Sequence, residues 1–220
     1  SKYGKNLIGS FYQPSLVLSD IQFLRSLSKR EIVCGYGEIL KHSLINDKKF
    51  FNFLNKNLKK ILNLSSPYIE KAIYESCKIK KRVVEKDEKE TALRKILNFG
   101  HTFAHAYEAS LGYSHKLNHG EAVILGIRTA LSFSLKEKML SKSEYNLIIN
   151  HIDNSGLPSS IKEYFSIKDL NKILSFMIKD KKNNSEKINL VLLKKIGKPI
   201  FNKQYSRKKL SLFLKNYLIN

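Results

Sequence analysis

The chain has 220 residues, of which 42% are hydrophobic, so it can bury one good core, or two small ones, without disulfide bonds. No apolar run approaches the roughly 18 residues of a membrane span, and the first residues lack the apolar stretch of a secretion signal. Cys34 and Cys77 show no CxxC spacing, which indicates reduced, buried thiols. We therefore expect a cytoplasmic protein with no membrane partner.

The charge balance is strongly basic, because 40 lysines and arginines stand against 19 acidic residues, a formal net charge of +21. Such an excess attracts phosphates and carboxylates, whether they belong to nucleic acid or to small metabolites. A nucleic-acid module would interleave exposed aromatics with the basic residues, whereas Phe50, Phe51 and Phe53 follow the core face of a helix. We expect no nucleic-acid partner, and a basic helical nucleic-acid-binding module is kept as the non-enzymatic alternative.

Helix start signals dominate the first part of the chain. Ser28 and Glu31 have the spacing of a capping box, in which each side chain bonds the other residue's backbone amide. Asp47 can cap a second helix, and Pro67 suits the first helical position of a third. The predicted helices cover residues 28–44, 47–62 and 67–85.

The second part of the chain continues this pattern. Apolar residues at helical spacing predict one continuous helix from about Thr91 to Leu111, which Gly112 can end. A branched apolar run over 188–193 predicts a strand paired with the segment around Ile200. The fold class is therefore mainly α, a single domain over residues 1–220 with a short β-hairpin near 188–201. Further helices are predicted over 120–135, after Ser141, after Ser166 and from Ser206 to Leu218.

Three histidines are the most informative feature of the sequence. His101 and His105 lie one helical turn apart and share a face, and His119 opens the next predicted helix. Glu38 with two of these imidazoles would suit a catalytic zinc, which takes three protein ligands and keeps an open position. Spacing alone nominates His105 beside His101 and leaves His119 as the other choice.

Several polar, glycine-bearing segments recur along the chain. They are Lys5-Asn6-Leu7-Ile8-Gly9, Phe11-Tyr12-Gln13-Pro14, Gly37-Glu38-Ile39-Leu40-Lys41, Ser76-Cys77-Lys78-Ile79-Lys80, Leu97-Asn98-Phe99-Gly100-His101-Thr102-Phe103-Ala104-His105, His119-Gly120-Glu121-Ala122-Val123, Asp180-Lys181-Lys182 and Ile196-Gly197. Together they resemble 3-dehydroquinate synthase, in the order and at the distances of that family. The resemblance spans about Lys5 to Gly197 and implies the multi-helical C-terminal domain that this family shares with metal-dependent polyol dehydrogenases.

The resemblance also implies a role for individual residues. Carried over to matching positions, the metal ligands are Glu38, His101 and His119, while His105 takes a polar role at the substrate. The remaining implied catalytic residues are Lys41, Lys80, Arg94, Asn98 and Lys181, the substrate-binding residues are Asn6 and Lys182, and the cofactor-binding residues are Lys5, Phe23, Leu24, Arg25 and Ser26.

The activity implied by the resemblance is the conversion of 3-deoxy-D-arabino-heptulosonate 7-phosphate to 3-dehydroquinate, with loss of phosphate, in the shikimate route to aromatic amino acids. It would use NAD and a divalent metal, zinc or cobalt, on a small phosphorylated sugar acid. A homodimer is a further expectation from the resemblance. Alternatives within the same architecture are other sugar-phosphate cyclases and metal-dependent polyol dehydrogenases, and Arg94, Asn98 and the Asp180-Lys181 pair favour the dehydroquinate branch.

The sequence also departs from the family pattern. Members carry an N-terminal NAD-binding, Rossmann-like domain, and none of the ten glycines here has the GxGxxG setting of its phosphate loop. We expect that domain as a partner and poor turnover by this chain alone. Smaller departures are Ala104 where relatives commonly have Gly, His42 where they have Tyr, and one extra residue in 114–118.

Overall fold

The computed structural model describes residues 9, 12–179 and 187–219, and this part of the chain is mainly helical with a single two-stranded antiparallel sheet. The predicted fold class is therefore confirmed. The α-helices are α1 (Lys29–Asn46), α2 (Lys48–Leu62), α3 (Tyr68–Lys86), α4 (His101–Ser110), α5 (His119–Lys136), α6 (Lys142–Asp153), α7 (Leu170–Lys179) and α8 (Arg207–Ile219); the strands are β1 (Lys187–Lys195) and β2 (Lys198–Ser206); the 3-10 helices are η1 (Ile21–Ser26), η2 (Leu93–Asn98), η3 (Ile161–Glu163) and η4 (Ile167–Asp169).

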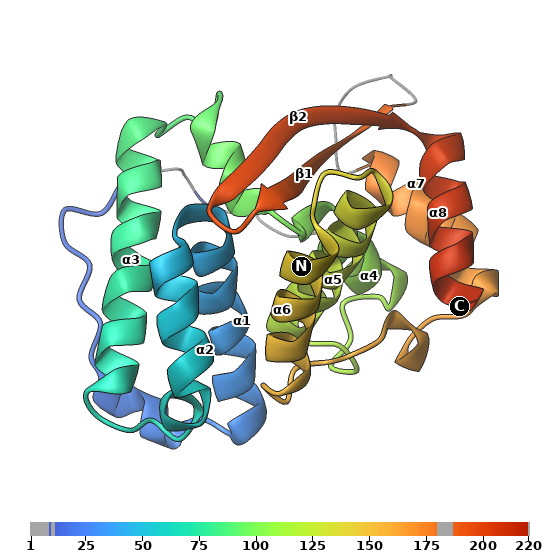
Figure 1. Cartoon of the computed structure of the whole chain (residues 1–220). Coiled ribbons are helices and arrows are strands. Elements are labelled where there is room, and N and C mark those ends of the chain that lie inside the picture. Colours follow the sequence, from blue (N-terminus) through green and yellow to red (C-terminus); the bar gives the residue numbers. More distant parts are fainter. Residues whose placement is uncertain (1–8, 10–11, 180–186, 220) are drawn as a thin grey trace.

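The helices α1, α2 and α3 stand side by side at one end of the molecule, and α4 to α8 gather at the other end (Figure 1). Helix α1 begins at the predicted capping box, because Ser28 accepts from the amide of Glu31 and Glu31 accepts in return from Ser28. Asp47 caps α2 as expected. Pro67 is the N-cap of α3 and does not occupy its first helical position, one residue from the prediction.

The predicted continuous helix from Thr91 to Leu111 is wrong. The chain forms η2, extends at Phe99, turns at Gly100 with a φ of 80° and only then begins α4 at His101. The turn requires glycine, because a Cβ at Gly100 would lie 2.7 Å from the backbone nitrogen of Ile127 on α5 and because residues with a side chain rarely adopt a positive φ. The apolar spacing continues across the break, since Ile96, Phe99 and Phe103 are all buried in one core.

Helix α5 lies at the centre of the molecule and packs against α1, α4, α6 and β1. Its side chains are buried on nearly every face, which explains why its sequence is apolar without the one-sided pattern of a surface helix. The central position of α5 means that residues at its N-terminus lie between the two helical groups.

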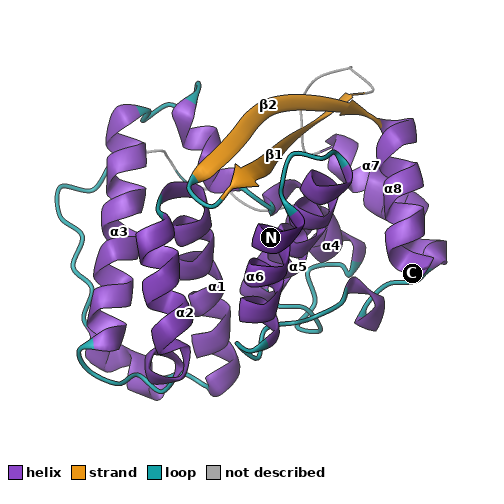
Figure 2. Ribbon diagram, in the orientation of Figure 1, coloured by secondary structure: helices purple, strands orange, loops and turns teal. Residues whose placement is uncertain are grey.

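The hairpin of β1 and β2 runs across both helical groups (Figure 2). Its tight turn holds Gly197 at a φ of 80°, and the Gly197 amide donates to the carbonyl of Leu44 at the end of α1. Farther along β1, the Leu193 amide donates to Ser134 Oγ of α5, and Thr102 of α4 donates to the Asn189 carbonyl. The hairpin therefore ties α1, α4 and α5 together.

The cysteine prediction is only partly confirmed. Both thiols are free, but Cys34 is half-buried and Cys77 is exposed, because Cys77 lies on the outward face of α3. No helix in the described part of the chain combines the length and the apolarity that crossing a membrane requires.

Candidate metal centre and anion pocket

Three side chains from three helices converge in the way that a divalent cation requires. Glu38 lies in the middle of α1, His101 is the first residue of α4, and His119 is the first residue of α5. Each offers one ligand atom, and the three atoms lie within 4.8 Å of one another. Two imidazoles and one carboxylate form a donor set that suits zinc and similar ions.

Each of these three residues stands next to a glycine at a helix crossing. A Cβ at Gly120 would lie 2.4 Å from the carbonyl oxygen of Cys34, and a Cβ at Gly37 would lie 3.0 Å from Ile124. At the crossing of α4 and α5, a Cβ at Gly126 would lie 2.2 Å from the carbonyl oxygen of Gly100. The missing side chains allow the backbones to approach closely, and this approach places the three donors within reach of one ion.

The two carboxylate oxygens of Glu38 have different surroundings. Oε2 accepts from Lys41 Nζ at 2.7 Å, whereas Oε1 is buried without a hydrogen-bond partner in the described structure and lies 3.8 Å from His101 Nε2. Burial acts to raise the pKa of Glu38, but the charge and hydrogen bond of Lys41 outweigh it and the net pKa is lowered. An ionised carboxylate with an unsatisfied buried oxygen beside an imidazole fits a metal ligand.

The imidazole of His101 is held neutral. Its pKa falls to about 3, because burial and then the charge of Lys41 disfavour the protonated ring. The Phe99 carbonyl lies 3.2 Å from Nδ1, so a proton on Nδ1 leaves Nε2 directed at Glu38 as a lone-pair donor. Metal ions bind neutral imidazole, so His101 is ready to coordinate at physiological pH.

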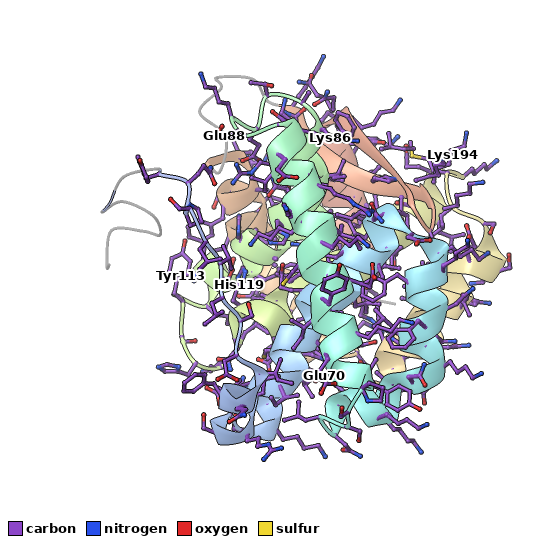
Figure 3. The ribbon with its side chains drawn as sticks, turned by 90° about the vertical axis from the view of Figure 1, so that its left-hand side faces the viewer. Glu70, Lys86, Glu88, Tyr113, His119 and Lys194 are labelled. Carbon is purple, nitrogen blue, oxygen red and sulfur yellow. The ribbon has the colours of Figure 1, made fainter. Side chains whose placement is uncertain are left out.

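The exposed His119 completes the group from the outer side (Figure 3). Its Nδ1 lies 3.1 Å from Oε2 of the buried Glu108 on α4. His105 lies beside these rings, with its centroid 5.4 Å from that of His101 and 6.4 Å from that of His119. Among the described residues, the group that could hold a metal ion consists of Glu38, His101 and His119, and His105 adjoins it.

A cavity of about 220 Å³ opens beside Glu38 and His101. It contains three of the cations suggested by the sequence, Lys41, Lys80 and Arg94, together with Asn98. Burial lowers the pKa of Lys41, although its ion pair with Glu38 opposes that shift. A concave surface lined with lysine and arginine attracts phosphate and carboxylate groups. The full lining is Glu38, Lys41, His42, Lys80, Glu90, Arg94, Leu97, Asn98 and His101.

One wall of the cavity is a loop that Asp87 holds together at the end of α3, near the labelled Lys86 and Glu88 in Figure 3. The Asp87 carboxylate accepts from the amides of Thr91, Ala92 and Arg94, which lowers its pKa to about 2. This aspartate after a helix has the local signal of an Asx turn, but the sequence analysis did not single it out.

Two residues in the cavity wall, Glu90 and His42, were not among the predicted site residues, although His42 was noted as a departure from the family pattern. Glu90 accepts from Asn98 Nδ2 at 2.5 Å, so it orients the amide that faces the cavity. His42 forms a 2.7 Å hydrogen bond with Ser76 Oγ through Nδ1, and burial together with Lys41 lowers its pKa to about 3. No helical spacing rule links Glu90 to Asn98, because Glu90 lies before η2 and Asn98 is its last residue.

The other residues suggested by the sequence have different outcomes. Arg94 lies in the wall with its guanidinium bonded to the Glu88 carbonyl. The four candidate cofactor residues lie on or at the end of η1, and none of them lines the cavity; they are Phe23, Leu24, Arg25 and Ser26. Four candidates lie outside the described residues, namely Lys5, Asn6, Lys181 and Lys182.

The fold is a multi-helical domain with a short antiparallel hairpin, and solved structures of larger proteins share it. The 2-epi-5-epi-valiolone synthase of Streptomyces hygroscopicus subsp. jinggangensis, solved with NAD+ and Zn2+, superposes with a TM-score of 0.84 at 20% identity, over 97% of this chain and 58% of that one. A 2-deoxy-scyllo-inosose synthase, solved with carbaglucose-6-phosphate, NAD+ and Co2+, superposes with a TM-score of 0.83 at 23% identity, over 98% of this chain and 60% of that one. At these identities the likeness shows the fold.

Sequence comparison gives the family. The model for the 3-dehydroquinate synthase C-terminal region matches residues 35–183, and the model for the N-terminal region matches residues 1–34. The chain belongs to the 3-dehydroquinate synthase family. It is 67% identical over 218 residues to the 3-dehydroquinate synthase of Pelagibacter ubique and 37% identical over 223 residues to that of Bradyrhizobium diazoefficiens. Both matches cover 99% of this chain, but only 59% and 58% of the length of those relatives.

Proposed function

We propose that this chain supplies the metal- and substrate-binding half of a 3-dehydroquinate synthase, a phosphate-eliminating lyase that uses NAD and a divalent metal. Its substrate would be 3-deoxy-D-arabino-heptulosonate 7-phosphate and its product 3-dehydroquinate, in the shikimate pathway. Family membership supports the reaction. The observation that carries the proposal is the convergence of Glu38, His101 and His119 beside a cavity lined with cations.

The donor set fits the metal, because two imidazoles and a carboxylate converge and one oxygen of that carboxylate is buried without a hydrogen-bond partner among the described residues. When bound, the metal would polarise a substrate hydroxyl as a Lewis acid, and NAD would accept and return the hydride. Zinc and cobalt are the candidate metals, since solved structures of the same fold contain one or the other.

The residues of this chain bind and orient the substrate. Arg94 offers a planar fork to a carboxylate or phosphate, and Lys41 and Lys80 act as point charges on the same anions. Asn98, fixed by Glu90, offers its amide to a hydroxyl. Outside the described residues, Asn6, Lys181 and Lys182 are proposed to bind the substrate as well.

His105 is the proposed proton-transferring residue. It lies one helical turn after His101 on α4, next to the metal ligands without belonging to their group. A histidine in that place reaches the same substrate hydroxyls that a metal would polarise, and histidine transfers protons readily near neutral pH.

The proposal includes an NAD-binding domain from the N-terminal part of the full-length enzyme, since this chain spans about three fifths of its relatives. Lys5 and the η1 residues from Phe23 to Ser26, of which Leu24 is half-buried and the others are exposed, would contact the dinucleotide held there. A homodimer and a cytoplasmic location complete the proposal, and the two free thiols support a reducing compartment.

Metal analysis of the purified chain tests the central claim. Wild type is expected to bind about one zinc or cobalt ion per chain, and His101→Ala is expected to bind none. The exposed His115, on the loop before α5, gives a matched control, and His115→Ala should keep the ion. Equal metal content in His101→Ala and wild type would overturn the assignment.

Activity needs a second experiment. Turnover of the heptulosonate phosphate is expected only after a purified N-terminal NAD-binding domain is added. Arg94→Ala should weaken substrate binding more than metal binding. No stimulation by that domain would count against the two-half arrangement. Turnover of a hexose phosphate in its place would favour another sugar-phosphate cyclase, and steep salt-dependent RNA binding without metal would favour the nucleic-acid alternative.

A further inference from the structure

A buried carboxylate stands behind one of the metal-binding histidines. Glu108, near the end of α4, is only 5% exposed, and its Oε2 lies 3.1 Å from Nδ1 of His119. His119 belongs to a different helix, α5, and its side chain is 47% exposed. The contact therefore links the interior of α4 to a ring that otherwise faces solvent.

A carboxylate is costly to bury unless a hydrogen-bond donor or a charge offsets the lost hydration. The Nδ1–H of His119 is such a donor, and an ionised Glu108 can only accept from it. The proton is thereby held on Nδ1, and Nε2 becomes the nitrogen with the lone pair. His119 would otherwise be free to change tautomer and ring orientation, because nearly half of its side chain lies in solvent.

The two histidines of the site are oriented by different means. His101 faces the backbone carbonyl of Phe99 at 3.2 Å and is largely buried, so packing and a neutral acceptor hold it. His119 lacks that packing and has a charged acceptor. A carboxylate behind an imidazole also raises the basicity of the opposite nitrogen, which strengthens a metal bond.

We propose that Glu108 is the positioning residue of His119: it fixes the Nδ1–H tautomer and directs Nε2 at the site formed with Glu38 and His101. This inference rests on the proposed metal centre. It adds a residue from outside the ligand group and outside the cavity wall, and it explains why an acid occupies a buried position on α4.

The first test uses the full chain without metal. Long-range proton–nitrogen NMR at neutral pH reports the tautomer of each histidine, and the His119 signals are identified by their loss in His119→Asn. Wild type is expected to show the Nδ1–H tautomer at His119, and Glu108→Gln a mixture shifted toward Nε2–H, with His101 unchanged. An Nε2–H tautomer at His119 in wild type would overturn the inference.

The second test measures metal affinity by chelator competition and the absorption spectrum of bound Co2+. Glu108→Gln is expected to weaken affinity about tenfold and Glu108→Ala up to about a hundredfold, each with an altered cobalt spectrum. Glu137→Gln is the matched control, since Glu137 pairs with Lys209 at the opposite end of α5 and should change neither readout. Folding is checked by circular dichroism, and Glu108→Gln keeps the size of the side chain.

The outcomes separate this inference from the proposed function. A wild type that binds metal, with Glu108→Ala binding it equally well and with the same spectrum, would overturn the role of Glu108 alone. A wild type that binds no metal would overturn the metal centre, while the tautomer of His119 in the metal-free protein would still decide whether Glu108 holds the ring.

Discussion

Replacing Gly120 by alanine tests whether the close approach of α1 and α5 sets the ligand positions. A Cβ there would lie 2.4 Å from the carbonyl oxygen of Cys34, whereas real Cβ contacts essentially never fall below 3.0 Å. The obstacle is the backbone of α1 at Cys34, so no flexible side chain can move aside. The two helices must separate by at least about 0.6 Å, and His119 moves away from Glu38 with them.

The expected cost follows from that displacement. Overpacking of a close contact costs about 1–3 kcal/mol, and each kcal/mol lowers the melting temperature of a chain this long by about 2–4 °C. Gly120→Ala should therefore melt about 2–12 °C below wild type. Metal–ligand distances tolerate only about 0.2 Å of error, so zinc affinity should also fall, by about tenfold.

Gly35 provides the control, because it follows Cys34 on α1, the helix that Gly120 of α5 contacts, and a Cβ there would have nothing within 4 Å. Gly35→Ala should stabilise the protein by about 0.5–1 kcal/mol, since alanine loses less backbone entropy in a helix. Thermal unfolding with and without zinc, and chelator competition, measure both variants. If Gly120→Ala melts at or above the wild-type temperature with full zinc affinity, the glycine contact does not set the site.

Further predictions concern pH and the cavity loop. His151 bonds Tyr36 and Asn55, and burial lowers its pKa to about 4 from 6.5. Between these pH values the unfolded chain binds a proton that the folded chain does not, so the free energy of unfolding should fall as the pH drops from 6.5 toward 4, by up to about 1.4 kcal/mol per pH unit. Urea unfolding at several pH values should show a smaller pH dependence of this free energy in His151→Gln than in wild type. An equal pH dependence in both proteins would contradict this. Asp87→Asn should speed hydrogen exchange at the amides of Thr91, Ala92 and Arg94. It should also weaken phosphate binding and leave zinc affinity unchanged. Unchanged amide exchange would refute the role of the Asp87 carboxylate in holding the loop. Lys41→Met should raise the pKa of Glu38, so the zinc affinity of the variant should fall more steeply than that of wild type as the pH drops from 7.5 to 5.5. Parallel pH profiles of zinc affinity for the two proteins would argue against the effect of Lys41 on Glu38.

Much of the helical framework follows from local signals in the sequence. Ser28 with Glu31 and Asp47 fix helix starts through their own side chains, so their positions can be predicted without tertiary information. The hairpin was expected because branched apolar residues from Ile188 onward are unusual for a helix, although β2 continues to Ser206, beyond the predicted 201.

The break at Gly100 could not be predicted, because its cause lies in another helix. Apolar residues on both sides of Gly100 share one core, so their spacing imitates a single helix. The contact with Ile127 leaves no room for a side chain at Gly100, and that contact is not visible in the sequence. Glu90 and Glu108 were missed for a related reason, since each acts on a residue brought near by packing between elements and not by chain spacing.

The position of the hairpin has a consequence for synthesis on the ribosome. Residues 187–206 hold α1, α4 and α5 together, yet they follow His119 in the chain by more than sixty residues. At a synthesis rate of about 5–20 residues per second, on the order of ten seconds pass between the synthesis of His119 and that of the hairpin. During that interval the apolar faces of the central helix lack their cover, which makes this a period when chaperones would bind the growing chain.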